Sequence, residues 1–253
     1  MIRNILAACG LILFLMHPHE TKANSLTNGG FESPVQTTPG IFATFNIPNA
    51  IVPIPSTYIT GWTVVQGNVD LTTTANYGPL TNTLDPGSKQ DVDLTGDVSG
   101  FPAGVKGGGL SQTFATVLGQ TYRLTFDYSH NPGTLSPTGN YVAQVTVVDA
   151  IAPANILLSD QVSQANGQVS QTTLRPPWVL FSQDFTATSD STTLTFLETE
   201  GGFNAGIYLD DVSVDPVVAS GTPLPGALPL FASGIGALGY LGLRRKRKAQ
   251  AAA

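Results

Sequence analysis

The chain has 253 residues with 27 glycines, 18 prolines and 11% charged residues, a composition typical of a β-sandwich with many turns. Residues 24–221 carry 16 acidic and 4 basic side chains, a net charge of −12, whereas seven of the 11 Lys and Arg residues lie in the two end segments. So acidic a surface repels phosphate backbones, which excludes a nucleic-acid-binding protein.

The N-terminus has the three-part pattern of a secretory leader. Arg3 precedes an apolar stretch over residues 5–16, and small residues stand at the −1 and −3 positions before Asn24. We therefore predict a signal peptide at 1–23, exported by the Sec translocon and removed by signal peptidase; the alternative is a buried first helix. Cys9 is the only cysteine and lies in this leader, so the mature protein would have no disulfide and no thiol nucleophile.

Residues 24–215 are expected to form one all-β domain. In the stretch 121–129, Tyr122, Leu124, Phe126 and Tyr128 alternate with polar residues, which is the period of a strand with one buried face. No segment of the domain shows a helical stripe, so we predict an antiparallel sandwich of about nine strands. The strand-forming segments are 61–74, 91–96, 108–130, 141–150, 178–201 and 206–217.

The sequence offers little catalytic chemistry. The mature chain has one histidine, His130, whereas a serine hydrolase or a zinc enzyme needs a nucleophile–base pair or several clustered ligands. Three carboxylate pairs remain as glycosidase candidates, and we interpret them as solvated or cation-binding groups. They are Asp91 with Asp93, Glu198 with Glu200, and Asp210 with Asp211. The domain is predicted not to be an enzyme; a glycan-active enzyme is the alternative.

Several short motifs occur in a fixed order along the domain. They are Asn28–Glu32, Gly61–Val64, Val69–Leu71, Asp93–Leu94, Leu110–Phe114, Gly119–Phe126, Asn131–Gly133 and Leu209–Val214. On these residues the chain resembles the bacterial choice-of-anchor C family, which is related to plant cell-wall domains of unknown function. The resemblance implies a galactose-binding-like jelly-roll β-sandwich.

The resemblance also implies a structural calcium ion. Similar carbohydrate-binding jelly rolls hold Ca²⁺ between an N-terminal Gly-Phe-Glu and a C-terminal Asp-Asp-Val, which here correspond to Glu32, Asp210 and Asp211. Backbone carbonyls near Gly29 would complete the oxygen shell that calcium requires. The alternative is that Glu32 and Asp211 only accept hydrogen bonds at strand ends.

A sugar site would need aromatic rings with polar neighbours. Trp62 lies in a strand-like stretch and is expected in the core. The candidates for glycan binding are residues in or beside predicted loops, together with a tryptophan that either the core or a loop could hold: Tyr77, His130, Asn131, Tyr141 and Trp178.

The C-terminus combines three elements: a proline-bearing linker at 216–226, an apolar run at 227–243 and a basic tail at 244–253. The run has 17 residues, about 25 Å as a helix, close to the lower limit for spanning a bilayer core of about 30 Å. The basic cluster predicts a transmembrane helix with a cytoplasmic tail, rather than a buried core helix. Its members are Arg244, Arg245, Lys246, Arg247 and Lys248.

This tail resembles the PEP-CTERM sorting signal of Gram-negative bacteria that make extracellular polysaccharide. Pro223, Leu224, Pro225 and Gly226 stand where that signal has Pro-Glu-Pro. The resemblance implies recognition by an exosortase, a membrane cysteine protease. It also implies export through the inner membrane, first as a membrane-anchored precursor and then to the cell surface or the medium.

Together these patterns predict an exported, non-catalytic surface or matrix protein that associates with polysaccharide after exosortase processing. Two alternatives are a glycan-active enzyme and a purely structural biofilm protein without a small ligand.

Overall fold

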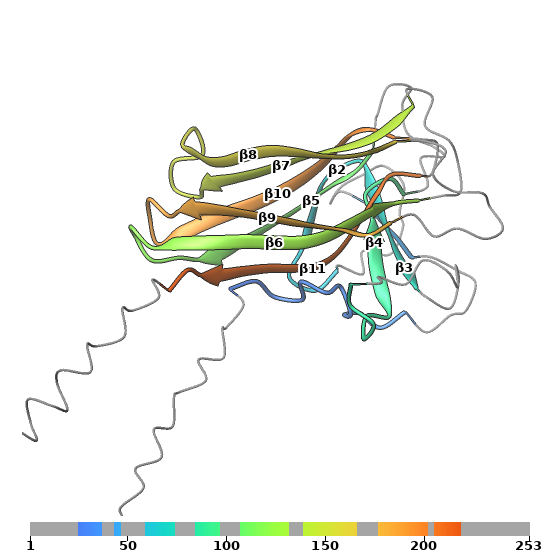
Figure 1. Cartoon of the computed structure of the whole chain (residues 1–253), viewed down its shortest axis with the longest axis horizontal. Helices are drawn as coiled ribbons and strands as arrows, with labels where there is room; N and C mark the ends of the chain where they lie inside the picture. The colour runs from blue at the N-terminus through green and yellow to red at the C-terminus, as the bar shows by residue number, and fades with distance from the viewer. Residues whose placement is uncertain are drawn as a thin grey trace, which may run out of the picture. The chain divides into compact units, whose positions relative to one another are not determined.

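The computed structural model describes residues 25–36, 43–46, 59–73, 84–96, 107–131, 139–165, 177–201 and 205–218. These residues form two antiparallel β-sheets, which confirms an all-β domain (Figure 1). The chain divides into two units, Met1–Pro216 and Val217–Ala253. The predicted signal peptide, sorting motif, membrane span and basic tail lie outside the described residues.

Strands that are distant in the sequence are neighbours within each sheet. The six-stranded sheet has the order β1 (Ala43–Asn46), β3 (Asn68–Thr73), β4 (Gln90–Asp93), β11 (Ile207–Pro216), β6 (Thr121–His130) and β9 (Val179–Thr186). The five-stranded sheet has the order β2 (Thr63–Gln66), β5 (Gly109–Ala115), β10 (Ser191–Glu200), β7 (Asn140–Asp149) and β8 (Ile156–Ala165). In Figure 1 the long strands β6, β7, β9, β10 and β11 run alongside one another, with β3 and β4 toward one end.

The predicted segments divide where the chain moves from one sheet to the other. The segment 61–74 bends at Gly67, which has φ +50°, so that β2 and β3 belong to different sheets. Two strands, β1 and β8, were not expected from the sequence. Strand β8 lies at a sheet edge, most of its side chains are at least partly exposed, and Val162 is its one buried residue. An edge strand with so weak an alternation gives little sequence signal.

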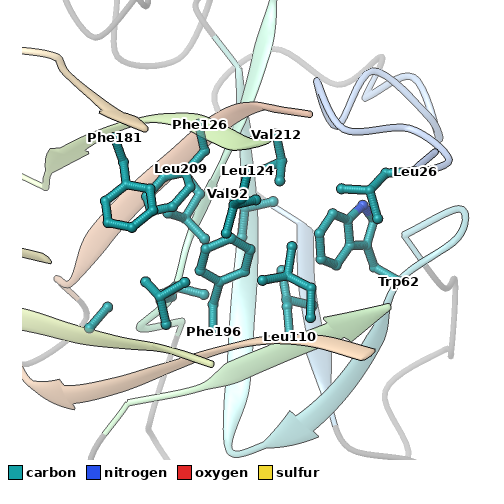
Figure 2. Close-up of a cluster of buried hydrophobic side chains, with 14 of the residues drawn as sticks. Leu26, Trp62, Val92, Leu110, Leu124, Phe126, Phe181, Phe196, Leu209 and Val212 are labelled. Atoms are coloured by element: carbon teal, nitrogen blue, oxygen red, sulfur yellow. The ribbon is translucent and has the colours of Figure 1, made fainter. Parts of the chain in front are cut away.

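Aromatic side chains join the two sheets across the core. Phe126 of β6 packs edge-on against Phe196 of β10, with ring centroids 5.0 Å apart, and stacks on Phe181 of β9 at 4.5 Å. Figure 2 shows Phe126 and Phe181 extending toward Phe196, with Trp62 beside Leu26. Tyr122, Leu124 and Phe126 of β6 are buried, as the alternation in the sequence predicted. Trp62 is 3% exposed and lies in the core, as expected.

The segment before β1 is hydrogen-bonded to both sheets. The Ser25 amide donates to the Val214 carbonyl and the Val212 amide donates to the Gly29 carbonyl, at 2.9 and 3.0 Å. On the other sheet, the Gln112 side chain exchanges two hydrogen bonds with the backbone of Thr27, at 2.6 and 2.9 Å. The first segment therefore lies beside the last strand and links the two sheets.

Phe126→Ala should be strongly destabilising, because it removes a fully buried ring that touches both sheets. We expect a loss of about 3–5 kcal/mol in the free energy of unfolding, measured by urea denaturation. Val117→Ala, at a side chain that is 65% exposed, is the control and should change stability by less than about 0.5 kcal/mol. Equal losses for the two variants would contradict this description of the core.

Candidate functional site

The Glu32 carboxylate lies beside the start of β4. Its Oε1 accepts hydrogen bonds from the backbone amides of Lys89 and Gln90, at 2.6 and 3.1 Å, and from the Ser88 hydroxyl at 3.5 Å. The Glu32 side chain is exposed. Glu32 therefore accepts hydrogen bonds at the end of a strand, as the alternative to calcium binding describes.

Asp210 and Asp211 differ sharply in environment although they are adjacent. Asp210 is fully buried, and its Oδ1 accepts a hydrogen bond from the Asp211 amide at 2.8 Å. The same oxygen lies near Gly30, at 3.9 Å from the position that a Cβ atom on Gly30 would take. Asp211 is exposed and has a left-handed φ of 48°. Within the described ranges, no three His, Cys, Asp or Glu side chains are grouped in a way that could hold a metal ion. The calcium ion expected at Glu32, Asp210 and Asp211 therefore stays a prediction.

Four of the five glycan candidates lie in the interior. His130, Asn131, Tyr141 and Trp178 are 2%, 7%, 1% and 7% exposed. The His130 ring stacks on Tyr141 with centroids 4.7 Å apart, and burial lowers the pKa of His130. All four side chains are buried, so the expectation that they lie on the surface of loops and are open to a sugar is wrong. They lie at or next to the ends of β6, β7 and β9. Tyr77 lies outside the described residues.

A different surface stands out on the five-stranded sheet. Along each strand, every second side chain points away from the core and is partly or fully exposed. One in-register row of these positions crosses all five strands and carries a hydroxyl on each: Thr63, Ser111, Thr195, Thr146 and Ser159. At about 4.8 Å between strands, this hydroxyl row is roughly 19 Å long.

The positions beside the hydroxyl row are also uncharged. Thr113 and Thr193 face each other with their hydroxyls 2.8 Å apart, and Gln144 donates to the Ser159 hydroxyl at 3.0 Å. We consider the hydroxyl row together with the row on either side of it, on the outward side of the five-stranded sheet. These three rows contain no Asp, Glu, Lys or Arg. The opposite sheet differs, since its outer side carries the exposed Arg123–Asp184 ion pair at 2.7 Å. We call the uncharged surface the neutral face.

Several of the carboxylates that were interpreted as solvated or cation-binding groups are buried. Asp91, Asp93 and Glu198 are at most 3% exposed. Asp93 accepts hydrogen bonds from the Thr95 amide and the Asn131 side chain, at 2.9 and 2.7 Å. Burial raises the pKa of Asp93 and of Glu198 well above the ordinary range, and the neighbouring Asp70 carboxylate raises that of Asp93 further.

Sequence reasoning missed the hydroxyl row and the burial of these acids. The row was in principle visible, because alternating stretches such as Ser-Gln-Thr and Thr-Leu-Thr show which residues share a face. Strand order and register, which join them into one row, are not in the sequence pattern. Nothing in the sequence indicated that these acids are buried, since carboxylates are normally exposed.

The stability of the protein should fall as the pH rises toward neutrality. Burial raises the pKa of Asp91 from 3.8 to about 7, Glu32 contributes in the same direction, and the hydrogen bond from Thr72 opposes both. The folded state therefore keeps a proton that the unfolded state has released, and stability decreases through this window by roughly 1 kcal/mol per pH unit for this group. The contribution of Asp91 itself should be complete near pH 7.

Asp91→Asn should reduce that slope, measured by urea unfolding between pH 4 and 8. Asp93 and Glu198 act in the same direction, so a smaller slope should remain. Asp190→Asn, at an exposed site, is the control. An Asp91→Asn protein with the full wild-type slope would contradict a buried, protonated Asp91.

No helix within the described part of the chain is long and apolar enough to cross a membrane. The predicted span at 227–243 is not among those residues.

Comparisons with known proteins give one curated relative and several similar structures. Halomucin of Haloquadratum walsbyi (strain DSM 16790 / HBSQ001) is 29% identical over 221 residues, which is 86% of this chain. The chain spans only 2% of that relative's length.

Among solved structures, TmCBM61 in complex with β-1,4-galactotriose is 16% identical with a TM-score of 0.44, covering 77% of this chain and 99% of that one. The CBM22-1 xylan-binding domain of Paenibacillus barcinonensis Xyn10C is 17% identical with a TM-score of 0.37, covering 73% and 100%.

A family model described as "Protein of unknown function (DUF642)" matches residues 24–215. This match covers the whole β-sandwich and most of the chain, and so the chain belongs to the DUF642 family.

Proposed function

We propose that this chain is an exported, non-catalytic surface or matrix protein whose sandwich associates with uncharged polysaccharide. The observation that carries the proposal is the neutral face, an uncharged surface with a central row of hydroxyls, flanked by amide and apolar side chains, on a domain with a net charge of −12. Sugar hydroxyls are recognised by hydroxyl and amide groups, which can donate and accept hydrogen bonds. Export follows from the predicted signal peptide and sorting tail, with exosortase as the processing partner.

The neutral face also favours binding over catalysis. Its Thr, Ser and Gln side chains provide neither a general acid nor a nucleophile with an adjacent base. The buried acids lie on the core side of β10 or on the other sheet, away from this surface. A galactose-binding-like jelly roll with calcium at Glu32, Asp210 and Asp211 is the finer form of the proposal.

Adding negative charge to the neutral face should weaken polysaccharide binding. Thr113→Glu and Ser159→Glu place carboxylates at exposed positions of β5 and β8, where a sugar would have to desolvate them. We expect each variant to lower the affinity for a neutral polysaccharide at least about tenfold by affinity electrophoresis of the full-length chain, with dextran, galactan and mannan as probes.

Ser182→Glu is the matched control, because it adds the same charge at an exposed position of β9 on the other sheet. Equal weakening by Ser182→Glu would show that net charge, not the neutral face, governs binding. No retention of the wild-type chain by any glycan would favour the structural alternative, and release of reducing sugar would favour an enzyme.

Mass spectrometry of the two ends of the mature protein tests the export proposal. The expected protein begins at Asn24 and lacks the basic residues 244–248. Secreted protein that retains the Arg-Arg-Lys-Arg-Lys sequence would contradict exosortase processing.

A further inference from the structure

Three turns lie together at one end of the sandwich. They join β5 to β6, β7 to β8 and β9 to β10, and they comprise residues 116–120, 150–155 and 187–190. The Thr116 amide donates to the Asp190 carbonyl at 2.9 Å, and the Asn155 side chain donates to the Thr188 hydroxyl at 2.9 Å. Figure 1 shows all three turns at the left of the view. We call this part of the domain the turn end.

Two of these turns expose large apolar side chains. Val117 and Leu118 of the β5–β6 turn are 65% and 71% exposed, and Ile151 of the β7–β8 turn is 70% exposed. The next three residues, 152–154, are Ala, Pro and Ala and are exposed as well. Surface turns are ordinarily built from Gly, Pro, Asn, Asp and Ser. A group of exposed apolar side chains in their place indicates an interaction site.

Hydrogen bonds fix the backbone of both apolar turns. The Val117 amide donates to the Tyr122 hydroxyl at 2.9 Å. In the other turn, the Asp149 carboxylate accepts hydrogen bonds from the amides of Ile151 and Ala152, at 2.9 and 3.2 Å. Turns that are already ordered lose little conformational entropy when they meet a partner, so a small apolar contact is not offset by that cost.

The turn end carries little exposed charge. The β5–β6 and β7–β8 turns contain no Asp, Glu, Lys or Arg. Asp190 in the third turn is exposed, and Asp215 near the end of β11 is half-buried. The exposed Arg123 and Asp184, on the outer side of the other sheet, form an ion pair whose charges offset each other. A partner that suits this end is therefore apolar or neutral rather than strongly charged.

The chain enters and leaves the sandwich at the same end. Pro216, the last residue of β11, pairs with Tyr122 directly after the β5–β6 turn. The Ser25 amide, at the start of the domain, donates to the Val214 carbonyl at 2.9 Å. In Figure 1 the arrowhead of β11 points toward the turn end. A segment attached to either end of the domain therefore starts beside the apolar turns.

The connection to the predicted membrane span is short. Ten residues, 217–226, separate Pro216 from the apolar run at 227–243, and fully extended they reach at most about 40 Å. The strand β10 alone is about 33 Å long, so the opposite end of the sandwich is a strand length farther from the attachment point. A domain attached to a bilayer by this connection has its turn end as the attached end.

We propose that Val117, Leu118 and Ile151 insert into the surface of the lipid bilayer that holds the predicted span. Apolar side chains are stabilised when they leave water for the boundary between headgroups and acyl chains. The attachment makes this contact intramolecular in effect, so a few side chains are enough. The strands then run away from the membrane and leave the neutral face open to a polymer. This proposal rests on the span at 227–243, which belongs to the proposed function.

The test is quenching of a fluorescent label by nitroxide-bearing lipid, with the full-length chain reconstituted into phosphatidylcholine vesicles. Cys9→Ser removes the only cysteine, and Leu118→Cys or Ile151→Cys then supplies a single labelling site. Ser163→Cys is the control, because Ser163 is exposed and pairs with Val142 near the start of β7, at the opposite end. Labels at the turn end should lose about half of their emission or more, and the control label should lose none.

A charge substitution tests the apolar character of the contact. Leu118→Asp, made together with Ile151→Cys, should reduce the quenching of the Ile151→Cys label at least about twofold, because a carboxylate resists leaving water. Leu180→Asp is the matched control: it makes the same change at a leucine that is 60% exposed, near the start of β9 and away from the turns. It should leave the quenching unchanged.

Four results would overturn the proposal. Vesicles that float without the chain would refute the span and the docking together, whereas polysaccharide binding by the neutral face would be unaffected. Floating chains whose Leu118→Cys and Ile151→Cys labels are not quenched would refute the docking alone. Equal quenching at Ser163→Cys would show a domain that lies flat on the lipid. A blue shift that grows with protein density, without quenching, would assign the turns to a second copy of the chain.

Discussion

The alternation of side chains along β10 is the constraint on which the rest of the structure depends. This strand is central in the five-stranded sheet, so its inward residues must fill the space between the sheets while its outward residues meet solvent. Leu194 and Phe196 go inward, and Phe196 meets Phe126 of the opposite sheet. The same alternation sends Thr193 and Thr195 outward, and it turns Glu198 toward the interior where the core ends. A shift of one residue in register would exchange all of these environments.

Two surfaces of the molecule thereby acquire different chemistry. The neutral face has a central row of hydroxyls flanked by amide and apolar side chains, such as Gln144, Val148 and Ile156, and none of the side chains in these three rows is charged. An acidic domain with one uncharged surface can stay dispersed through charge repulsion and still approach a neutral polymer. The segment from Ser25 to Phe31 supports this arrangement, because it is hydrogen-bonded to both sheets.

The sequence predicted those features that depend on local alternation. The all-β class, the inward face of β6 and the core position of Trp62 follow from periodicity and residue type. Strands β1 and β8 were missed because edge strands carry weak patterns. His130 and Tyr141 were placed at loops because sequence does not say which face a strand end presents, and they instead stack in the interior. The burial of Asp93 and Glu198, and the joining of five hydroxyls into one row, arise from strand order, which no single segment encodes.

The most direct test of the proposed function is a crystal structure of the protein grown with a neutral oligosaccharide. The neutral face predicts a sugar chain lying across β5, β10 and β7, with its hydroxyls on Ser111, Thr195 and Thr146. A sugar bound instead beside His130 and Trp178, or no bound sugar at saturating concentration, would contradict it.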